Sequence, residues 1–216
     1  MSPLETLGFA LGTSFASGLN LYITVAAAGL FQHFGLVDLP AQLHVLANPV
    51  VIGLALVLFV IEFVADKIPY VDSVWDAVHT FIRPLAAAVL SYAAFAGGVP
   101  EEWRVGAALL AGGVALTSHG VKATTRAAAN VSPEPFSNWG LSLAEDSLAV
   151  FLSWMAAVHP LITGGIVIAL VILAILVIRK LFRFFRQAFA GFSGKQSLAQ
   201  PGPDSPAHAQ AQPPGS

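Results

Sequence analysis

The sequence contains no cysteine among its 216 residues, and few of its residues are charged. The lack of cysteine excludes a disulfide scaffold, a thiolate metal site and a cysteine nucleophile. Charged residues make up 10% of the chain, whereas a soluble domain usually carries about 25%. The formal net charge is only −2, and no basic stripe precedes the C-terminal region. These properties argue against a soluble enzyme and against a nucleic-acid partner.

Signatures of common enzyme classes are also missing. The chain has no Gly-x-Ser-x-Gly, no His-Glu-x-x-His and no Gly-x-x-x-x-Gly-Lys segment, so no motif indicates a reaction class or a cofactor. Its first residues, Met-Ser-Pro-Leu-Glu, lack the basic region of a signal peptide. We therefore expect the first apolar stretch to be retained as a membrane span.

Hydrophobic residues make up 56% of the chain and are concentrated in six stretches. Each stretch approaches the roughly 20 residues that a helix needs to cross about 30 Å of hydrocarbon. The runs are continuous rather than alternating, which favours helices over barrel strands. We predict an all-α, polytopic membrane helix bundle of about six transmembrane helices within residues 1–190. The predicted spans are 7–31, 49–65, 74–96, 105–127, 136–158 and 161–178.

The distribution of Lys and Arg predicts the orientation. Arg179, Lys180, Arg183 and Arg186 follow the last span, which places the C-terminus in the cytoplasm by the positive-inside rule. Six spans then place the N-terminus on the same side. Only Arg104 falls in an outer loop under this arrangement. We predict a multi-pass protein of the bacterial inner membrane with both termini cytoplasmic.

The C-terminal region has two parts. Residues 179–190 combine basic and aromatic side chains, as in a helix that lies at the headgroup level and attracts anionic lipid. A simpler interpretation is a stop-transfer flank with aromatic anchors. Residues 191–216 are rich in Gly, Ser, Gln, Ala and Pro, a composition typical of a disordered tail.

Two segments of the chain are similar to each other. Residues 12–28 align without gaps with residues 113–129. Each segment is followed by a span that carries acids and then by a third span, which gives repeat halves of about 5–98 and 102–180. Three spans per half would place the halves in opposite senses, as in the 3+3 inverted repeats of secondary transporters. Chance is the alternative, because small residues are common in membrane helices. The matched residues are Gly12 and Gly113, Ser17 and Ser118, Thr24 and Thr125, and three terminal alanines.

Polar and ionisable residues recur at helical spacing within or beside these spans. A charge at membrane depth costs about 2.5 to 3.5 kcal/mol on insertion scales, so such residues usually face partners or water. We predict that they form a substrate- or ion-binding site and that none is catalytic. The predicted site residues are Asn20, Glu62, Asp66, Asp72, Asp76, His79, Arg83, His119, Lys122, Arg126, Glu145 and Asp146.

The acidic part of this set offers more than one interpretation. Glu62 and Asp66 are four residues apart at the end of the second span, and Asp72, Asp76 and His79 follow at spacings of four and three. Several carboxylates and an imidazole on facing helix ends suit a hard cation or a proton relay. The alternative is an internally neutralised cluster in which Lys67 and Arg83 pair with the acids. One His among carboxylates is a weak ligand pattern, so we predict no metal site.

The fourth and fifth spans carry complementary charges. His119, Lys122 and Arg126 share one face, which suits an anionic headgroup or substrate; Lys and Arg that end a helix at the membrane surface are the alternative. Glu145 and Asp146 lie deeper, about 13 Å along their helix at 1.5 Å per residue. Glu145 is the strongest candidate for a proton- or cation-coupling residue. Asn20 suits a substrate contact or a hydrogen bond between helices.

The order of these residues resembles the domain-of-unknown-function family numbered 4126. The resemblance covers about residues 3–185, and it implies a small bacterial inner-membrane protein with this span pattern, without implying a reaction. The residues that carry it are Asn20, Glu62, Asp66, Lys67, Pro69, Asp72, Trp75, Asp76, Arg83, Pro84, Ser137, Asn138, Glu145 and Asp146.

The inverted repeat and the charged faces favour a small transporter or a lipid-handling permease. An intramembrane enzyme that acts on a lipid with Asp72, Asp76 and His79 is one alternative, and a non-catalytic membrane scaffold is another. The expected partner is the lipid bilayer. Small transporters often form homodimers, but these residues do not fix the oligomeric state.

Overall fold

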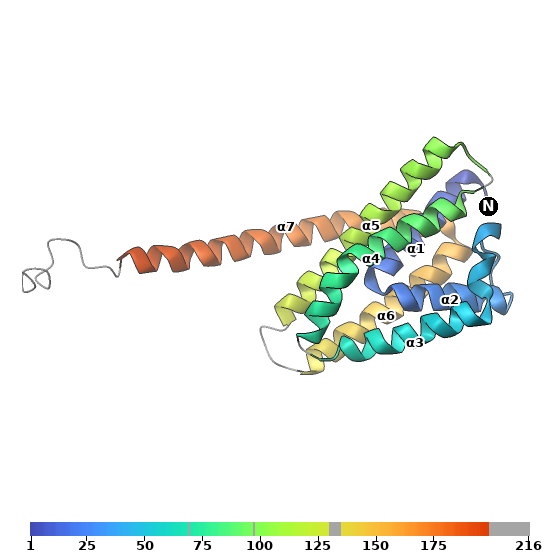
Figure 1. Cartoon of the computed structure of the whole chain (residues 1–216). Coiled ribbons are helices and arrows are strands. Elements are labelled where there is room, and N and C mark those ends of the chain that lie inside the picture. The colour runs from blue at the N-terminus through green and yellow to red at the C-terminus, as the bar shows by residue number, and fades with distance from the viewer. Residues whose placement is uncertain (69, 97, 130–134, 199–216) are drawn as a thin grey trace, which may run out of the picture. The chain divides into compact units, whose positions relative to one another are not determined.

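The computed structural model describes residues 1–68, 70–96, 98–129 and 135–198. These residues form eight helices and no strand, which confirms the predicted all-α class (Figure 1). The helices are α1 (Pro3–Leu19), α2 (Leu21–His33), the short 3₁₀ helix η1 (Ala41–Ala47), α3 (Pro49–Ala65), α4 (Val71–Ala94), α5 (Glu101–Ala129), α6 (Pro135–Val158) and α7 (Pro160–Leu198).

Three helical segments are long and apolar enough to cross a membrane: Val71–Ala94, Asn138–Val158 and Pro160–Lys180. A fourth crossing results if η1 and α3, which are bent by 66° relative to each other, count as one span. The described part of the chain therefore has the helices of a membrane protein. The arrangement of six crossings stays a prediction, because α1 and α2 are short and α5 carries several charges within its length.

The first predicted span, 7–31, is not one helix but two. Asn20 has φ −150° and ψ 109°, an extended conformation that ends α1 and begins α2. Its side-chain Oδ1 accepts hydrogen bonds from the backbone N–H groups of Tyr22 and Ile23. A side-chain acceptor at this position satisfies donors that the first turn of a helix leaves free. Asn20 therefore both interrupts the first helix and caps the second.

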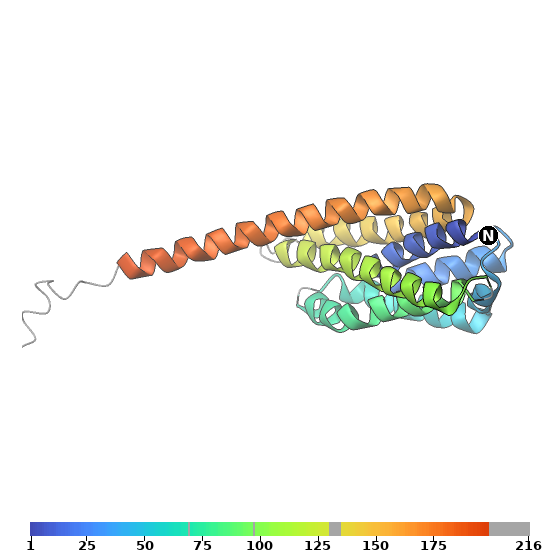
Figure 2. The same cartoon turned by 90° about the horizontal axis from the view of Figure 1, so that it is seen from above.

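Helix α1 lies in the interior of the first compact unit, and most of its residues after Leu7 are buried. Three glycines allow neighbouring backbones to approach closely. A Cβ at Gly8 would collide with the carbonyl of Pro160, one at Gly12 with Ala156 and Thr163, and one at Gly18 with Ser118 and Ala115. Small residues at such contacts let membrane helices pack tightly. Figure 2 shows α1 lying between α5 and α6.

Helices α3 to α6 agree with the predicted ranges to within four residues at each end, whereas α7 continues past residue 178 to Leu198. Helix α3 covers the predicted residues 49–65, and its first turn is capped by Asn48, whose Oδ1 accepts from Val50 N at 2.8 Å. Two buried apolar clusters hold the bundle together. One is centred on Leu11, Phe15 and Leu152, and the other on Phe9, Leu39 and Ala156.

The chain divides into two compact units, the first from Met1 to Ile175 and the second beginning at Leu176. Helix α7 begins in the first unit and continues to Leu198 in the second. The predicted basic segment 179–190 is therefore part of a long helix. The predicted tail was expected to begin at 191, but residues 191–198 still belong to α7, and residues 199–216 lie outside the described residues.

Candidate functional site

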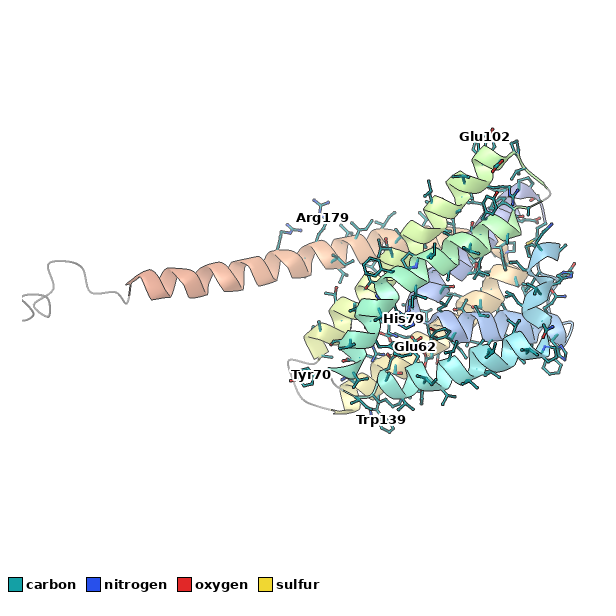
Figure 3. All side chains as sticks on the ribbon, in the orientation of Figure 1. Glu62, Tyr70, His79, Glu102, Trp139 and Arg179 are labelled. Carbon is teal, nitrogen blue, oxygen red and sulfur yellow. The ribbon has the colours of Figure 1, made fainter. Side chains whose placement is uncertain are left out.

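Ionisable side chains from four helices meet in one network inside the bundle. Eight residues are joined by ion pairs or hydrogen bonds, and most of their side chains are fully buried. Figure 3 shows Glu62 and His79 between the helices, whereas Tyr70 lies at the outside. The eight residues are Glu62 and Asp66 from the end of α3, Asp76 and Arg83 from α4, His119, Lys122 and Arg126 from α5, and Glu145 from α6.

Arg83 is the hub of the network on the α4 side. Its Nη2 lies 2.5 Å from Glu62 Oε1 and 3.8 Å from Asp76 Oδ1. Its Nη1 donates to the carbonyl oxygen of Gly18, at 2.8 Å, where α1 approaches its end. A helix end buried without such a donor would leave a carbonyl unsatisfied. Arg83 therefore ties the break between α1 and α2 to the acid at the end of α3.

Lys122 and Arg126 form the other half of the network on α5. Lys122 Nζ lies 3.0 Å from Glu62 Oε1, 2.9 Å from Asp66 Oδ2 and 3.9 Å from Glu145 Oε2. Arg126 Nη2 lies 3.0 Å from Asp66 Oδ2 and 2.6 Å from Glu145 Oε2, and its Nη1 donates to the backbone carbonyl of Asp66 at 2.7 Å. These two cations join α3, α5 and α6.

His119 is held in one tautomer by its neighbours. Its Nδ1 lies 2.8 Å from Arg83 Nη1, and a guanidinium can only donate, so Nδ1 is the acceptor. The proton is then on Nε2, which donates to the carbonyl oxygen of Asp76 and contacts the hydroxyl of Thr80, both at 3.0 Å. His119 thus acts as a neutral spacer between α4 and α5.

Two hydrogen-bonded pairs flank the network. Asn20 Nδ2 donates to Asp146 Oδ1 at 2.9 Å, which links the break between α1 and α2 to α6. Tyr22 Oη lies 3.0 Å from His79 Nε2, and His79 Nδ1 lies 2.8 Å from the carbonyl oxygen of Trp75. Because a carbonyl only accepts, His79 donates from Nδ1 and receives the Tyr22 hydroxyl at Nε2.

The remaining predicted residue, Asp72, lies in the first turn of α4 and is fully buried. Its Oδ1 accepts from the backbone N–H of Ser73 at 2.6 Å and from the Ser73 hydroxyl at 3.2 Å. Asp72 is thus one turn away from Asp76, with its carboxylate engaged locally.

Lys67, in the loop after α3, does not join the network directly. Its Nζ donates to the carbonyl oxygen of Phe63 at 2.9 Å and lies over the Phe63 ring, 2.8 Å from the centroid. Burial lowers the pKa of Lys67, and the charges of Asp146 and Asp66 act in the opposite direction. Of the two cations that the sequence suggested as partners of the acids, Arg83 forms ion pairs with them, whereas Lys67 donates to a backbone carbonyl.

Several buried carboxylate oxygens in the described structure have no hydrogen-bond partner: Glu62 Oε2, Asp66 Oδ1, Asp76 Oδ1 and Asp146 Oδ2. Buried acceptors of this kind normally contact a proton, water or a ligand. Among the described residues, no group of three or more His, Cys, Asp or Glu side chains is arranged to hold a metal ion. The free oxygens therefore suit a proton, water or a polar ligand.

Sequence reasoning missed Tyr22, Thr80 and the carbonyl of Gly18, all of which contact predicted site residues. The only sequence signal was the position of Tyr22, two residues after Asn20. The other contacts depend on how α1, α4 and α5 pack against each other, which helical spacing does not encode.

The fold and the network define a class: an all-helical protein with membrane-compatible helices and a buried ionic site. The chain belongs to a family described as a domain of unknown function (DUF4126), whose model matches residues 7–180. This confirms the resemblance found in the sequence. No curated protein and no solved structure matches the chain.

Proposed function

We propose that this protein is a small transporter that couples movement of a solute across the bacterial inner membrane to the binding of protons at Asp76 and Asp146. One observation carries the proposal: among the described residues, the five carboxylates of the network and its flanking pair have only three cations within ion-pair distance, while Lys67 acts on Asp146 and Asp66 from farther away. The cations are Arg83, Lys122 and Arg126.

The pairing identifies which acids are in excess. Glu62, Asp66 and Glu145 each lie within 3.0 Å of a cation. Asp76 is 3.8 Å from Arg83, which it shares with Glu62, and the partner of Asp146 is the neutral Asn20. A buried charge without a close partner is costly in an apolar bundle and is usually neutralised. Both residues also carry an oxygen with no hydrogen-bond partner, where a proton can reside.

The sequence favoured Glu145 as the proton- or cation-coupling residue, whereas we propose Asp76 and Asp146 for this role. Glu145 Oε2 is 2.6 Å from Arg126 and 3.9 Å from Lys122, so two cations favour its ionised form. Asp146 is the next residue along α6 and faces the break at Asn20 instead. We therefore assign Glu145 to the paired set and Asp146 to proton coupling.

The interrupted helix supports transport over a purely structural role. Secondary transporters often place their sites where a helix is broken near the middle of the membrane. Here the break at Asn20 contacts an excess acid, and Arg83 binds the preceding turn through Gly18. A change in the protonation of Asp146 would alter its hydrogen bond to Asn20, the residue at which α1 ends and α2 begins.

The proposed topology has six crossings, with α1 and α2 together as the first. The two similar segments lie in α1–α2 and α5, and they meet where Gly18 packs against Ala115 and Ser118. This contact is the one expected if the halves form an inverted repeat with their first helices at the centre. We further propose cytoplasmic termini and contact of residues 179–190 with anionic lipid.

Transport in reconstituted vesicles tests this proposal. Proteoliposomes with an imposed pH gradient are incubated with a mixture of small cellular metabolites, and the accumulated solutes are identified by mass spectrometry. We expect at least one solute to accumulate only when the gradient is present. Asp146→Asn and Asp76→Asn should reduce that accumulation to the level of protein-free vesicles.

Glu102→Gln is the control, because Glu102 is an exposed acid of α5 outside the network. The proposal of proton-coupled transport is wrong if no solute accumulates, or if accumulation is unchanged in both Asp76→Asn and Asp146→Asn. Retained accumulation in a charge-swapped variant, Asp76→Arg with Arg83→Asp, would instead indicate that pairing alone matters.

A further inference from the structure

Lys67 lies between the end of α3 and the start of α6. Its ammonium Nζ donates to the carbonyl oxygen of Phe63 at 2.9 Å and lies over the ring of the same residue. It is also 5.5 Å from the ring centroid of Trp139, an exposed residue near the start of α6. Figure 3 shows Trp139 at this end of the bundle. The side chain of Lys67 therefore lies between two helices that do not pack closely against each other in the described structure.

The contacts that hold Lys67 in this position can be exchanged for others. Among the described residues, the buried ion pairs do not include Lys67, and its side chain is only partly buried. A lysine carries its charge on a flexible stem, and a cation–π contact at a partly exposed position is weak. Asp146 and Asp66 are the acids whose charges act on Lys67 most strongly. Lys67 can therefore move toward a carboxylate when one becomes charged.

Asp146 is the acid that this movement would serve. It keeps 8% of its accessible surface, whereas Glu62 and Asp66 keep none. The groups around it are Asn20, which donates to Oδ1 at 2.9 Å, and the charged Lys122, Asp66 and Glu62. Lys122 already lies 3.0 Å from Glu62 and 2.9 Å from Asp66. An ionised Asp146 therefore lacks a cation of its own, and a buried charge is stable only when it is paired.

We propose that Lys67 is the alternate counter-ion of Asp146: when Asp146 releases its proton, the Lys67 ammonium leaves Phe63 and pairs with the carboxylate. The proton passes to water, and Lys67 keeps its own protons. The new ion pair joins the α3–α4 loop to α6, and protonation of Asp146 releases it again. This inference rests on the proposed function, because it adds the residue that stabilises the ionised form of Asp146.

Infrared titration of the carboxylic acid band tests the pairing. The reference protein is Asp76→Asn in lipid bilayers, where the remaining band belongs to Asp146 and is identified by its loss when Asp146→Asn is added. In Lys67→Met the ionised carboxylate loses its cation. The pH at which half of the band is lost should therefore rise by about one unit, a tenfold change in proton affinity. Lys67→Arg keeps the charge and should restore the midpoint of the reference protein.

Lys180→Met is the matched control, because Lys180 is an exposed residue of α7, and it should leave the midpoint unchanged. An unchanged midpoint in Lys67→Met would overturn the pairing and leave proton binding at Asp146 intact. Absence of any acid band from the reference protein would instead overturn the proposed function, and this inference with it.

The reactivity of the Lys67 amine gives a second readout, from the lysine itself. The reference protein and its Asp146→Asn variant are exposed briefly to acetic anhydride one pH unit above the measured midpoint, and acetylated lysines are quantified by mass spectrometry. We expect Lys67 to react about fivefold more slowly when Asp146 is present, because a nearby carboxylate favours the unreactive ammonium form. The exposed Lys180 should react equally in both proteins. Equal rates for Lys67 would overturn the proposal.

Discussion

The three cations of the network, Arg83, Lys122 and Arg126, each lie within 3.0 Å of a carboxylate of Glu62, Asp66 or Glu145. The other two acids, Asp76 and Asp146, should therefore tolerate the loss of their charge. Asp76→Asn and Asp146→Asn imitate the protonated side chains that we propose. Each should change the free energy of unfolding by less than about 1 kcal/mol, because no cation loses its close partner. The measurement is unfolding by SDS in mixed micelles.

The paired acids should behave differently in the same measurement. Asp66→Asn removes the partner that Lys122 and Arg126 share, at 2.9 and 3.0 Å. Lys122 keeps Glu62 and Arg126 keeps Glu145, but three buried cations then share only two close carboxylates, so we expect a loss of about 1.5 to 3 kcal/mol. Equal losses in Asp66→Asn, Asp76→Asn and Asp146→Asn would contradict the proposed division of the acids.

Arg83 supplies a second test at the scale of one residue. Its guanidinium contacts Glu62, the Gly18 carbonyl and His119 from two nitrogens. Lysine keeps the charge but presents it at one point, so Arg83→Lys should leave the Gly18 carbonyl or His119 without its donor.

We expect a loss of about 1 to 3 kcal/mol in Arg83→Lys, the cost of an unsatisfied buried group. The control is Arg179→Lys at an exposed position of α7, where the effect should be close to zero. An unchanged stability in Arg83→Lys would show that only its charge matters.

At the scale of elements, the break between α1 and α2 depends on Asn20. Its Oδ1 caps α2 while its Nδ2 donates to Asp146. Asn20→Ser retains a cap but loses the bond to Asp146, Asn20→Ala loses both, and Asn20→Asp places a second carboxylate against Asp146. The free energy of unfolding should therefore be highest in Asn20→Ser, lower in Asn20→Ala and lowest in Asn20→Asp.

Asn48→Ala separates capping from the contact with Asp146. Asn48 caps α3 through Val50 N and is exposed, so its loss should cost about 1 kcal/mol, a typical value for a cap. Asn20→Ala should cost clearly more. Equal costs in thermal unfolding would mean that the Asn20–Asp146 bond contributes nothing.

The packing of α1 against α5 predicts the effect of a single methyl group. Gly18→Ala should push these helices apart, because the new Cβ would collide with Ala115 and Ser118. Overpacking of this kind costs about 1 to 3 kcal/mol. Gly113→Ala is the matched control on α5, where no atom lies within 4 Å. It should be neutral or slightly stabilising, as expected from helix propensity.

The helices themselves were largely readable from the sequence. Continuous apolar runs with Pro or Asn at their ends predicted α3 and α6 almost to the residue. The helix boundary at Asn20 was not predicted, because Leu19 before it and Leu21, Tyr22 and Ile23 after it continue the apolar pattern. A capping side chain overrode that pattern locally.

The sequence predicted which ionisable residues lie together inside the bundle but not how they contact one another. Spacing placed Asp76, His79 and Arg83 on one face of a helix, and the structure places them there. It did not show that Arg83 would bind Glu62, since that contact depends on the packing of α3 against α4 and α5. The packing also decides which acids have a close cation. The lack of one beside Asp76 and Asp146 could therefore not be predicted from the sequence.

At the scale of the whole molecule, a buried ionic network lies among helices that are compatible with a membrane. Such a network is stable only if its charges balance. Two of the five acids in the network and its flanking pair lack a close cation of their own, so we infer that proton binding stabilises the fold. The same residues would then serve both stability and the proposed transport.

Infrared spectroscopy of the protein in lipid bilayers tests that claim most directly. At neutral pH we predict a carboxylic acid carbonyl band from two protonated side chains. Asp76→Asn and Asp146→Asn should each remove about half of this band, whereas Glu145→Gln should leave it unchanged. Absence of the band, or its loss in Glu145→Gln alone, would contradict the account.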